Sequence, residues 1–294
     1  MYRHKVIWDM DPGIDDAIAL LLALKAKAKL VGITTVAGNV EVEKTAQNAC
    51  RILRFMGRKI PVGKGLDRPL VRELRTCPEI HGEDGLGNCG LPRAPTKVPH
   101  FMNIWRKVPD ETIALCTGPL TNVAVALLSL PRLRERLKEI VVMGGALNLT
   151  KWGKGNVTRD AEFNFYTDPE AVFIVLRSGV PVTLVPLDAT MHPSLKIRGK
   201  LGTPLSPAAR LAQKMLDYQI ARLGETYLHD VTALMYLLAP HLFKPQLCRV
   251  SIKLEERKRG KVYVDTKGCM VKVSLVGDGG ELMSLVKKLL GFEG

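Results

Sequence analysis

The sequence predicts one α/β domain over residues 1–294, built on an open, mostly parallel twisted sheet with helices on its faces. Three observations support this fold class. Short apolar runs alternate with longer stretches of helical apolar spacing, an order that favours a parallel sheet with right-handed crossovers. Hydrophobic residues make up 46% of the chain, which is enough for a large core. The sequence contains no repeat, low-complexity tract or linker that would divide it.

The fold is expected to begin with two strand–helix units. The apolar run Val6–Trp8 predicts a buried strand at 5–9. The helix expected at 14–28 is apolar on nearly every side, so it should be buried as well. A second strand at 30–36 leads into a helix at 41–57 that is apolar on one face. These two units would place the first strands of a parallel sheet side by side.

The remaining elements continue this order into the C-terminal third. An irregular segment at 64–98 is more typical of a functional loop than of a simple connector. In chain order we expect strands at 60–62 and 111–117, a helix from 121 to 130, strands at 139–143 and 180–187, helices at 205–222 and 230–239, a strand pair at 249–252 and 261–265, and a terminal helix.

The chain is strongly basic, with 43 Lys and Arg against 29 Asp and Glu and a formal net charge of +14. A nucleic-acid-binding module would explain this charge. Such a module needs aromatic platforms or a basic groove, whereas aromatic residues make up only 5% of the chain and the basic residues are spread along it. We therefore expect the charge to be a property of the surface, with no nucleic acid as a partner.

The sequence shows no pattern typical of a membrane span or of a secreted protein. No stretch of about 18 residues is apolar and free of charge, so no membrane span is expected. The N-terminus runs into the first predicted strand without a signal-peptide pattern. The six cysteines include no C-x-x-C pair, which is typical of reduced thiols rather than of disulfides or a zinc site. We expect a cytoplasmic protein that contacts no membrane.

Four carboxylates lie within eight residues where the first predicted strand ends: Asp9, Asp11, Asp15 and Asp16. No Lys or Arg lies between positions 5 and 25, so no neighbour in sequence neutralises them. Closely spaced carboxylates repel each other unless a cation or protons compensate their charge. Oxygen-only ligands on a turn suit a hard cation such as Ca²⁺ or Mg²⁺. The alternative, a solvated helix start, is disfavoured because the flanking residues are apolar.

Polar residues also follow other predicted strands, at 37–39, 117–122 and 144–164. In an open α/β sheet the ligand binds at the carboxyl ends of the strands, so these turns should share one edge with the acidic residues. Glu162 and Asn164 alternate around an aromatic residue, which would turn both polar groups to one side, toward a sugar. Asp230 precedes an apolar helix, where simple N-capping is the competing interpretation.

Taken in order, these motifs resemble the nucleoside hydrolases, the inosine–uridine-preferring nucleoside hydrolase family. The matching motifs are DMDPGIDDA, AGN, HGEDGLG, TGPLTN, MGG, GN, AEFN-x-x-x-DPEA and HD. The similarity runs from Asp9 to about Asp265. It implies an open mixed sheet with helices on both faces. Met10 stands where Thr or Val is usual in the family, and we expect little effect because this residue only flanks the acidic ones.

The resemblance implies Ca²⁺-dependent hydrolysis of the N-glycosidic bond of ribonucleosides to free base and ribose. Ca²⁺ would be held by the side chains of Asp11, Asp16 and Asp230 and by the backbone carbonyl of Thr121. Asp11 would act as general base on the attacking water, and His229 would protonate the departing base. The bond would break through a transition state that resembles an oxocarbenium ion.

The resemblance also implies which residues contact the substrate. Asp15 and Asn164 would bind the ribose hydroxyls, with Asn39 nearby. Asn156 and Glu162 would hold the 5′ side of the sugar. The residues expected around the base are His81, Phe163, Tyr227 and His229. Members of the family are usually dimers or tetramers, so a homodimer or homotetramer is expected.

Three questions stay open at this point. A strand followed by Asp-x-Asp also opens the haloacid-dehalogenase-type phosphatases, but their motif does not continue as Pro-Gly-x-Asp-Asp. A relative that binds nucleosides without cleaving them would also match, although every expected ligand position is filled. The preferred base is not readable, because purine and pyrimidine specialists share the metal and ribose residues and differ in loops, here 72–90 and 222–229.

Overall fold

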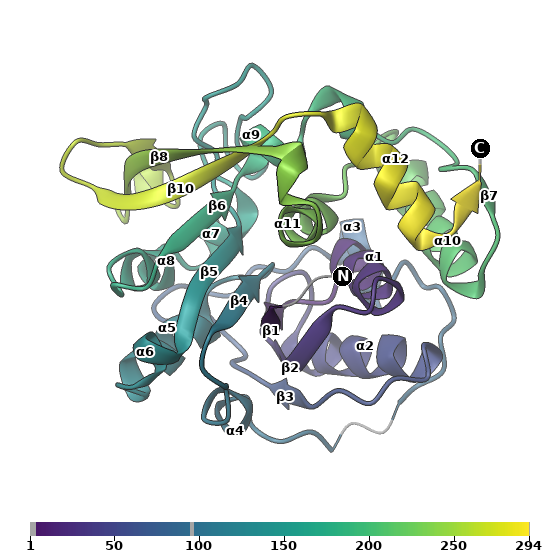
Figure 1. Cartoon of the computed structure of the whole chain (residues 1–294), viewed down its shortest axis with the longest axis horizontal. Helices are drawn as coiled ribbons and strands as arrows, with labels where there is room; N and C mark the ends of the chain where they lie inside the picture. Colours follow the sequence, from purple (N-terminus) through teal and green to yellow (C-terminus); the bar gives the residue numbers. More distant parts are fainter. Residues whose placement is uncertain (1–3, 95–96, 294) are drawn as a thin grey trace.

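Nine strands form one twisted sheet through the centre of the molecule (Figure 1). The computed structural model describes residues 4–94 and 97–293. The strand order is β3-β2-β1-β4-β5-β6-β10-β8-β9. Neighbouring strands from β3 to β10 are parallel, whereas β8 pairs antiparallel with both β10 and β9. This mostly parallel sheet with helices on its faces confirms the predicted fold class.

The elements have the following bounds. The strands of the large sheet are β1 (Lys5–Met10), β2 (Lys29–Thr35), β3 (Val62–Lys64), β4 (Thr112–Cys116), β5 (Leu137–Met143), β6 (Val182–Val185), β8 (Phe243–Ile252), β9 (Val262–Val264) and β10 (Cys269–Val276). The longer helices are α1 (Ile14–Lys25), α2 (Val42–Phe55), α5 (Thr121–Ser129), α8 (Pro169–Leu176), α10 (Pro207–Leu223), α11 (His229–Leu238) and α12 (Gly279–Leu290). The short helices are α3 (Pro78–His81), α4 (Met102–Trp105), α6 (Leu133–Arg136), α7 (Phe163–Thr167) and α9 (Leu187–Thr190), and β7 (Thr203–Pro204) pairs with β11 (Phe292–Glu293) in a small second sheet.

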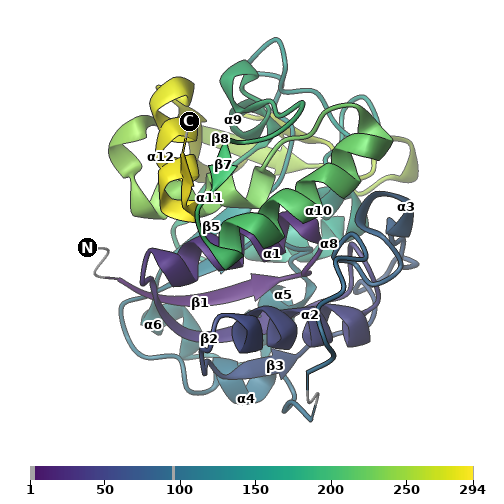
Figure 2. The same cartoon turned by 90° about the vertical axis from the view of Figure 1, so that its right-hand side faces the viewer.

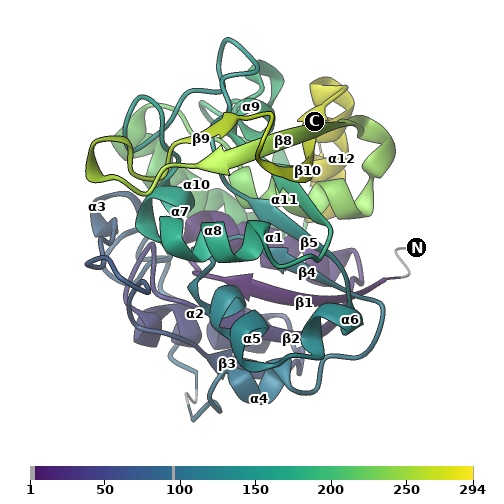
Figure 3. The same ribbon diagram turned by 90° about the vertical axis from the view of Figure 1, so that its left-hand side faces the viewer.

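The sheet separates two hydrophobic cores, and β1 shows how its residues are divided between them. Val6, Trp8 and Met10 belong to the core shared with α1, α2, α10, α11 and α12, whereas Ile7 belongs to the core shared with α4, α5 and α8. Successive side chains of a strand point to opposite faces, so a strand covered on both sides reads as a continuous apolar run. Figure 2 shows the side with α1, α2 and α10, and Figure 3 shows the side with α5 and α8.

Helix α1 is enclosed by other elements, as its sequence predicted. Every residue from Ile14 to Leu24 is buried. The helix packs against α2, α10, α11 and α12. It ends at Lys25, three residues before the predicted end at 28. No helix in the described ranges is long and apolar enough to cross a bilayer.

The largest difference from the predicted order is β10. The predicted pairing near 249–252 and 261–265 is present, with Val250 opposite Val264 in β8 and β9. Strand β10, which was not predicted, lies between β6 and β8 and connects this pair to the parallel sheet. Its sequence CMVKVSLV alternates apolar and polar residues from Val271 onward, so a strand signal was present.

The strand register brings the carboxyl ends of the parallel strands to one edge. Asp9 of β1 lies opposite Cys116 of β4, and Cys116 lies opposite Val142 of β5. Met143 at the end of β5 lies opposite Val185 of β6. The turns that follow these strands therefore open on the same side of the molecule, as predicted. Helix α11 packs against α1, which places its N-terminus at this edge as well.

We expect the enclosure of α1 to be measurable as stability. Leu22 on α1 is 0% exposed, whereas Leu128 on α5 is 60% exposed. Leu22→Ala should lower the free energy of unfolding by about 2–5 kcal/mol, because it removes buried contacts and leaves a cavity. The matched change Leu128→Ala should stay within about 0.5 kcal/mol. Urea unfolding measures both, and equal losses in the two variants would contradict the assigned burial.

Candidate functional site

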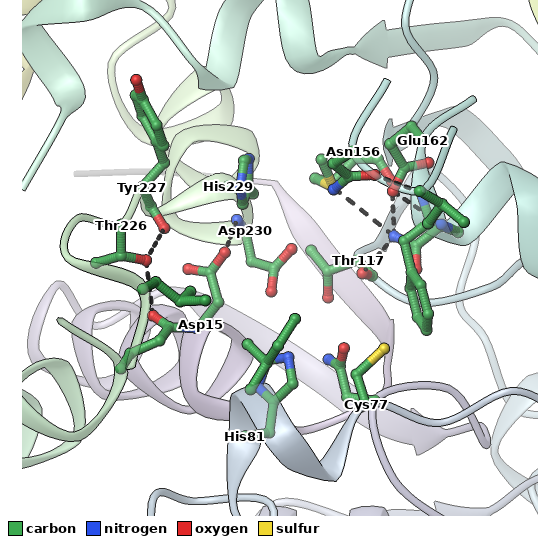
Figure 4. Close-up of a pocket in the computed structure, with 18 of the residues that line it drawn as sticks. Asp15, Cys77, His81, Thr117, Asn156, Glu162, Thr226, Tyr227, His229 and Asp230 are labelled. Atoms are coloured by element: carbon green, nitrogen blue, oxygen red, sulfur yellow. Dashed lines mark hydrogen bonds between the residues drawn. The ribbon is translucent and has the colours of Figure 1, made fainter. Parts of the chain in front are cut away.

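A cavity of about 400 Å³ opens at the carboxyl edge of the sheet. This volume lies within the range of small-molecule sites. The predicted site residues that line it are Asp15, Asn39, His81, Asn156, Glu162, Phe163, Asn164, Tyr227, His229 and Asp230. In Figure 4, Asp15 and Asp230 lie between a wall with Tyr227 and an opposite wall with Glu162. The structure therefore brings together residues from the whole length of the chain.

An acid cluster, which we define as Asp11, Asp15, Asp16 and Asp230, lies at the floor of this cavity. Asp15 and Asp230 line the cavity directly, whereas Asp11 and Asp16 are hydrogen-bonded to the lining residues Asn39 and Thr117. The cluster forms where two helix N-termini meet, because Asp15 and Asp16 lie in the first turn of α1 and Asp230 lies in the first turn of α11. The backbone N–H of Asp230 donates to Asp15 Oδ2 at 3.0 Å and joins the two helix ends. All four side chains are buried, with at most 7% exposure. Helix N-termini favour negative charge, which helps such residues to stay buried.

Hydrogen bonds orient one side of the cluster and leave other oxygens free. Thr117 Oγ1 donates to Asp16 Oδ1 at 2.7 Å, and the Asn39 backbone N–H donates to Asp11 Oδ2 at 2.7 Å. Asn39 Nδ2 also donates to the Asp11 carbonyl at 3.1 Å. In contrast, Asp11 Oδ1 and Asp15 Oδ1 are buried without any hydrogen-bond partner. A buried polar atom of this kind needs a ligand or an ion to satisfy it.

The negative charge of the acid cluster is not compensated by the protein. Among the described residues, no ion pair with Lys or Arg involves any of its four carboxylates. Burial raises the pKa of Asp16 to about 6, and burial together with neighbouring carboxylates raises the pKa values of Asp11 and Asp230 well above the usual range. Burial also raises the pKa of Asp15 strongly. The cluster therefore needs either protons or a cation at neutral pH.

The backbone is shaped to pass very close to Asp11. A Cβ atom at Gly38 would collide with its carboxylate, and a Cβ atom at Gly118 would lie 2.8 Å from Asp11 Oδ1. Only glycine fits such positions, which explains these residues of the AGN and TGPLTN motifs. In the part of the chain that the structure describes, no three His, Cys, Asp or Glu side chains already converge as a metal-ligand set. A metal site at the acid cluster therefore rests on charge and on its unpartnered oxygens.

Asp9 belongs to the same sequence motif but not to the acid cluster. Its carboxylate accepts hydrogen bonds from Thr34 Oγ1 and Asn122 Nδ2. Asn122 lies on α5, on the opposite face of the sheet from α1. Because β1 is pleated, Asp9 points away from the cavity and ties β1 to β2 and α5. Burial raises its pKa to about 7.

Glu162 and Asn164 form one wall of the cavity. Glu162 accepts backbone N–H groups from Asn164 at 2.8 Å and from Gly145 and Phe165 at 3.0 Å each. Asn164 Nδ2 donates to the carbonyls of Thr117 at 2.9 Å and Met143 at 3.2 Å, so its Oδ1 is the free end. Burial raises the pKa of Glu162 to about 7.

Glu162 and Asn164 both line the cavity, but through a helix start rather than through the alternation around Phe163 on which the prediction rested. Glu162 is the N-cap of the short helix α7, and Phe163 is its first residue. The side chain of Glu162 turns back to satisfy the free N–H groups of that helix, as an N-cap does. Asn156 supports the same turn, because its Oδ1 accepts the Phe163 N–H at 2.9 Å. The side chains of Glu162, Phe163 and Asn156 all line the cavity. The start of α7, rather than an alternating pattern, places them there.

The opposite wall contains two histidines whose tautomers follow from their partners. His81 Nδ1 accepts the backbone N–H of Ile14 at 3.1 Å. His229 Nδ1 lies 2.7 Å from Thr190 Oγ1. Thr190 is fully buried and has no other hydrogen-bond partner in the described ranges, so its hydroxyl must donate to that nitrogen. Burial lowers the pKa of both histidines to about 4, so each is neutral and carries its proton on Nε2.

Tyr227 lines the cavity but its hydroxyl is directed elsewhere. Its ring centroid lies 6.0 Å from that of His229, and Lys196 Nζ lies 5.7 Å from the Tyr227 ring. Lys196 in turn pairs with Glu225 at 2.7 Å. In Figure 4 the Tyr227 hydroxyl points away from Asp15 and His81. The ring face, rather than the hydroxyl, is therefore the part available to a ligand.

Thr121 is the one predicted ligand that the structure places away from the acid cluster. It is the first residue of α5, so its carbonyl points along the helix axis toward the next turn. Its hydroxyl donates to Asp168 Oδ2 at 2.7 Å. Thr117, four residues earlier in the same TGPLTN motif, lies at the end of β4 and lines the cavity next to Asp16. Of the two threonines, Thr117 lines the cavity and the predicted Thr121 does not.

Several residues of the cavity were not predicted, namely Cys77, Glu79, Ile80, Thr117, Met143, Val157, Gln219, Leu223, Glu225 and Thr226. Thr117 and Met143 belong to motifs that were quoted, so their positions at strand ends were a usable signal. Gln219 lies within α10, where helical spacing alone does not distinguish a pocket-facing residue from a core residue. Only the packing of α10 across the cavity reveals it.

Comparison with known proteins agrees with this site. The family described as inosine-uridine preferring nucleoside hydrolase matches residues 6–279. The chain is 36% identical over 284 residues to the non-specific ribonucleoside hydrolase RihC of Escherichia fergusonii, a match that covers 92% of this chain and 91% of that protein. A plant nucleoside hydrolase has a similar structure, with a TM-score of 0.89 and 29% identity over 98% of this chain and 99% of that one.

A second solved structure is similar over the same length. It is a purine-preferring ribonucleoside hydrolase from Gardnerella vaginalis, with a TM-score of 0.82 and 28% identity over 98% of this chain and 99% of that one. The family match, the sequence relatives and the shared architecture all span the acid cluster and both walls of the cavity. The chain therefore belongs to the inosine-uridine preferring nucleoside hydrolase family.

Proposed function

We propose that the protein hydrolyses the N-glycosidic bond of ribonucleosides and releases the free base and ribose. The observation that carries this proposal is the buried acid cluster on the floor of a cavity with amide and imidazole groups on its walls. A cationic ribosyl group develops as such a bond breaks, and buried carboxylates stabilise that charge electrostatically. Family membership and the ribonucleoside hydrolases among the relatives support the same reaction.

The acid cluster fits one Ca²⁺ ion. Its charge is uncompensated, two of its oxygens are unpartnered, and the donors are oxygens, which Ca²⁺ prefers. We assign Asp11, Asp16 and Asp230 as side-chain ligands. In place of Thr121 we assign the backbone carbonyl of Thr117, which lines the cavity beside Asp16. When bound, the metal would orient a water molecule and lower its pKa.

Asp11 is the proposed general base. Asn39 occupies Asp11 Oδ2, and the unpartnered Oδ1 is free to accept a proton from the attacking water. Burial and neighbouring carboxylates raise the pKa of Asp11 well above its usual range, which makes this carboxylate a stronger base. The residue can therefore take up the proton without a large energetic penalty.

Asp15, Asn164 and Asn39 are the proposed ribose-binding residues, and Asn156 and Glu162 are assigned to the 5′ side. Asp15 Oδ1 and Asn164 Oδ1 are both acceptors that receive no hydrogen bond from a described residue, so both can accept hydroxyl protons of the sugar. Two such contacts fix the sugar relative to the base and the water.

The departing base is assigned to the opposite wall. We assign His229 as the proton donor to the departing base. It would first take up a proton from solvent to form the imidazolium, with Thr190 Oγ1 accepting its Nδ1–H. It would return to neutral imidazole as its Nε2 proton passes to a nitrogen of the leaving base and the glycosidic bond breaks. His81 presents a second N–H, and the rings of Phe163 and Tyr227 supply apolar contact.

The cellular setting is also a proposal. All six cysteines are free thiols, which supports a reducing cytoplasm. The proposed partner is a free ribonucleoside rather than a nucleic acid, because the cavity is enclosed by walls of polar side chains. A homodimer or homotetramer is proposed from the family resemblance, and sedimentation equilibrium would distinguish the two.

Metal removal should abolish activity, and added Ca²⁺ should restore it. Asp11→Asn should lower kcat by roughly 10²–10⁴ or more, since a base and a ligand are lost together. The control Asp110→Asn changes a carboxylate with 85% side-chain exposure and should have no effect. Nucleoside hydrolysis assays with elemental analysis test both variants, and full activity of verified metal-free protein would overturn the metal assignment.

Ca²⁺ should also stabilise the fold, more at pH 7 than at pH 5. Burial raises the pKa of Asp16 to about 6, above its unfolded value, so protonation stabilises the metal-free protein at low pH. That contribution is lost as the pH rises through about 6. Ca²⁺ compensates the carboxylate charge in place of these protons. At a free concentration of 100 times its Kd, Ca²⁺ adds about 2.7 kcal/mol to the free energy of unfolding. Thermal melts at both pH values, with and without Ca²⁺, measure the difference; a pH-independent shift would contradict it.

Ribonucleosides should be strongly preferred over 2′-deoxynucleosides and nucleotides. A polar site built around a hydroxyl rejects an analogue without it by roughly 10⁴ in favourable cases, because Asp15 and Asn164 are then left unpaired. Glu162 should repel a 5′-phosphate. The measurement is kcat/KM for uridine, deoxyuridine and uridine monophosphate, and comparable values for the three would speak against the assigned sugar contacts.

The role of His229 should depend on the leaving group. His229→Ala should slow inosine hydrolysis by roughly 10²–10⁴, whereas p-nitrophenyl riboside, whose leaving group departs without help, should be nearly unaffected. His241→Ala changes an exposed histidine and serves as the control. If both substrates slow equally, His229 only positions the base, and the proton comes from another donor.

A further inference from the structure

Thr117 connects the acid cluster to the wall of the cavity that is assigned to the sugar. Its hydroxyl donates to Asp16 Oδ1 at 2.7 Å, and its carbonyl accepts Asn164 Nδ2 at 2.9 Å. In Figure 4, Thr117 lies between Asp230 and Glu162. A carbonyl oxygen has two lone pairs, so the carbonyl of Thr117 keeps one of them for a cation.

The hydroxyl of Thr117 is oriented by Trp8, a residue that the proposed mechanism does not use. Trp8 lies on β1, and its Nε1 donates to Thr117 Oγ1 at 2.9 Å. An indole nitrogen can only donate, so the single proton of the Thr117 hydroxyl is left for Asp16. The backbone N–H of Thr117 also donates to the Asp9 carbonyl of β1 at 2.9 Å. Strand β1 therefore holds Thr117 through one side-chain bond and one backbone bond.

The bond from Thr117 is the short one among those that Asp16 accepts. Asp16 Oδ2 accepts the Gly13 backbone N–H and Asn39 Nδ2, but each of these bonds is 3.4 Å long. The 2.7 Å bond to Oδ1 therefore sets the direction of the carboxylate. We call the three residues joined in this way, Trp8, Thr117 and Asp16, the Trp8 network.

The Trp8 network is sealed inside the protein. Trp8 and Asp16 are 0% exposed, and Thr117 is 2% exposed. Bulk water is therefore not available to replace the indole N–H if it is removed. A hydrogen bond in such an interior is electrostatically stronger than one in water. Side chains that orient metal ligands from behind typically change metal affinity by about 10–100-fold when they are lost.

A second network of the same three residue types lies on the opposite face of the sheet. Trp105 Nε1 donates to Thr34 Oγ1 at 3.2 Å, and Thr34 Oγ1 donates to Asp9 Oδ1. Trp105 is fully buried like Trp8, but it belongs to the other hydrophobic core. Asp9 is not a member of the acid cluster. The Trp105 network, which is Trp105, Thr34 and Asp9, therefore provides a matched control inside the same protein.

We propose that Trp8 is a positioning residue for the metal site, which acts through the Thr117 hydroxyl to hold the Asp16 carboxylate and the Thr117 carbonyl in place for Ca²⁺. The proposal rests on the proposed function, because that function assigns both groups as metal ligands. Trp8 does not line the cavity, so it acts only through Thr117. Its ring fills the core as the ring of Trp105 does, whereas its N–H group serves the site.

The test is the Kd of Ca²⁺ for the metal-free full chain, measured by isothermal titration calorimetry with Ca²⁺ alone. Trp8→Phe keeps an aromatic ring and removes the N–H, so it should raise the Kd by about 10–100-fold. Trp105→Phe removes the equivalent N–H of the Trp105 network and should leave the Kd unchanged. Thermal melts of the metal-free proteins should show a similar loss of stability in both variants, because each loses one buried hydrogen bond.

A double-mutant cycle tests whether Trp8 acts through Thr117. Thr117→Val removes the hydroxyl and keeps the backbone carbonyl, so it should raise the Kd at least as much as Trp8→Phe. The double variant should bind Ca²⁺ no more weakly than Thr117→Val alone, because both changes break the same connection to Asp16. Thr117→Ser keeps the hydroxyl and should keep the wild-type Kd.

A measurement on the wild type does not depend on whether Trp8→Phe folds. The chain has three tryptophans, so ¹⁵N-labelled tryptophan gives three indole N–H resonances in an NMR spectrum. Trp105→Phe and Trp152→Phe assign two of them, and the third belongs to Trp8. Added Ca²⁺ should shift the resonance of Trp8 and leave that of Trp105 in place, because only the Trp8 network ends at an assigned ligand.

Equal changes of the Kd in Trp8→Phe and Trp105→Phe would overturn the proposal, and so would a Trp8 resonance that does not respond to Ca²⁺. Effects of Trp8→Phe and Thr117→Val that multiply in the double variant would also overturn it, because Trp8 would then act independently of Thr117. In each of these cases Ca²⁺ binding and nucleoside hydrolysis by the wild type still stand. A wild type that binds no Ca²⁺ would instead overturn the metal assignment, and the role of Trp8 with it.

Discussion

The interaction on which the site depends is the hydrogen bond from the backbone N–H of Asp230 to Asp15 Oδ2. It joins the N-termini of α1 and α11, although these two residues are 215 positions apart in the chain. The two helix dipoles offset only part of the charge of four buried carboxylates. The rest must come from a cation or from protons. The uncompensated negative charge of these carboxylates is unfavourable without a cation or protons. The same charge stabilises a substrate on which positive charge develops.

Around the acid cluster, each polar side chain is oriented by a partner outside the cavity. Carbonyls of Thr117 and Met143 engage the amide nitrogen of Asn164, which leaves its oxygen for a ligand. Thr190 and Thr226 act on acceptor atoms instead. Their hydroxyls donate to His229 Nδ1 and Gln219 Oε1, so the N–H groups of these two side chains remain for a ligand. Asn164 therefore presents an acceptor to the cavity, whereas His229 and Gln219 present donors. Such preorganisation reduces the entropy lost when the substrate binds.

Much of this architecture was predictable from local patterns. The strand–helix order, the enclosed α1 and the acidic turn after β1 depend on apolar spacing and turn composition, which are properties of neighbouring residues. Residue patterns and the resemblance to a known family together predicted Glu162 and Asp230 for the site, and both line the cavity. Neither predicted Thr117, because its place in the cavity depends on where β4 ends and α5 begins at the edge of the sheet.

The sequence by itself determined the fold class, the buried first helix and the chemical class of the site, because each follows from residue types at short spacing. Tertiary structure alone decided the rest. The end of β1 at Met10 separated Asp9, which lies within the strand, from Asp11, which lies in the turn after it, and β10 entered between β6 and β8 through contacts with distant strands. Packing of α10 and α11 across the cavity determined which atoms of Gln219 and His229 face a ligand. These outcomes depend on hydrogen bonds and packing between distant or separately folded segments, which no local pattern encodes.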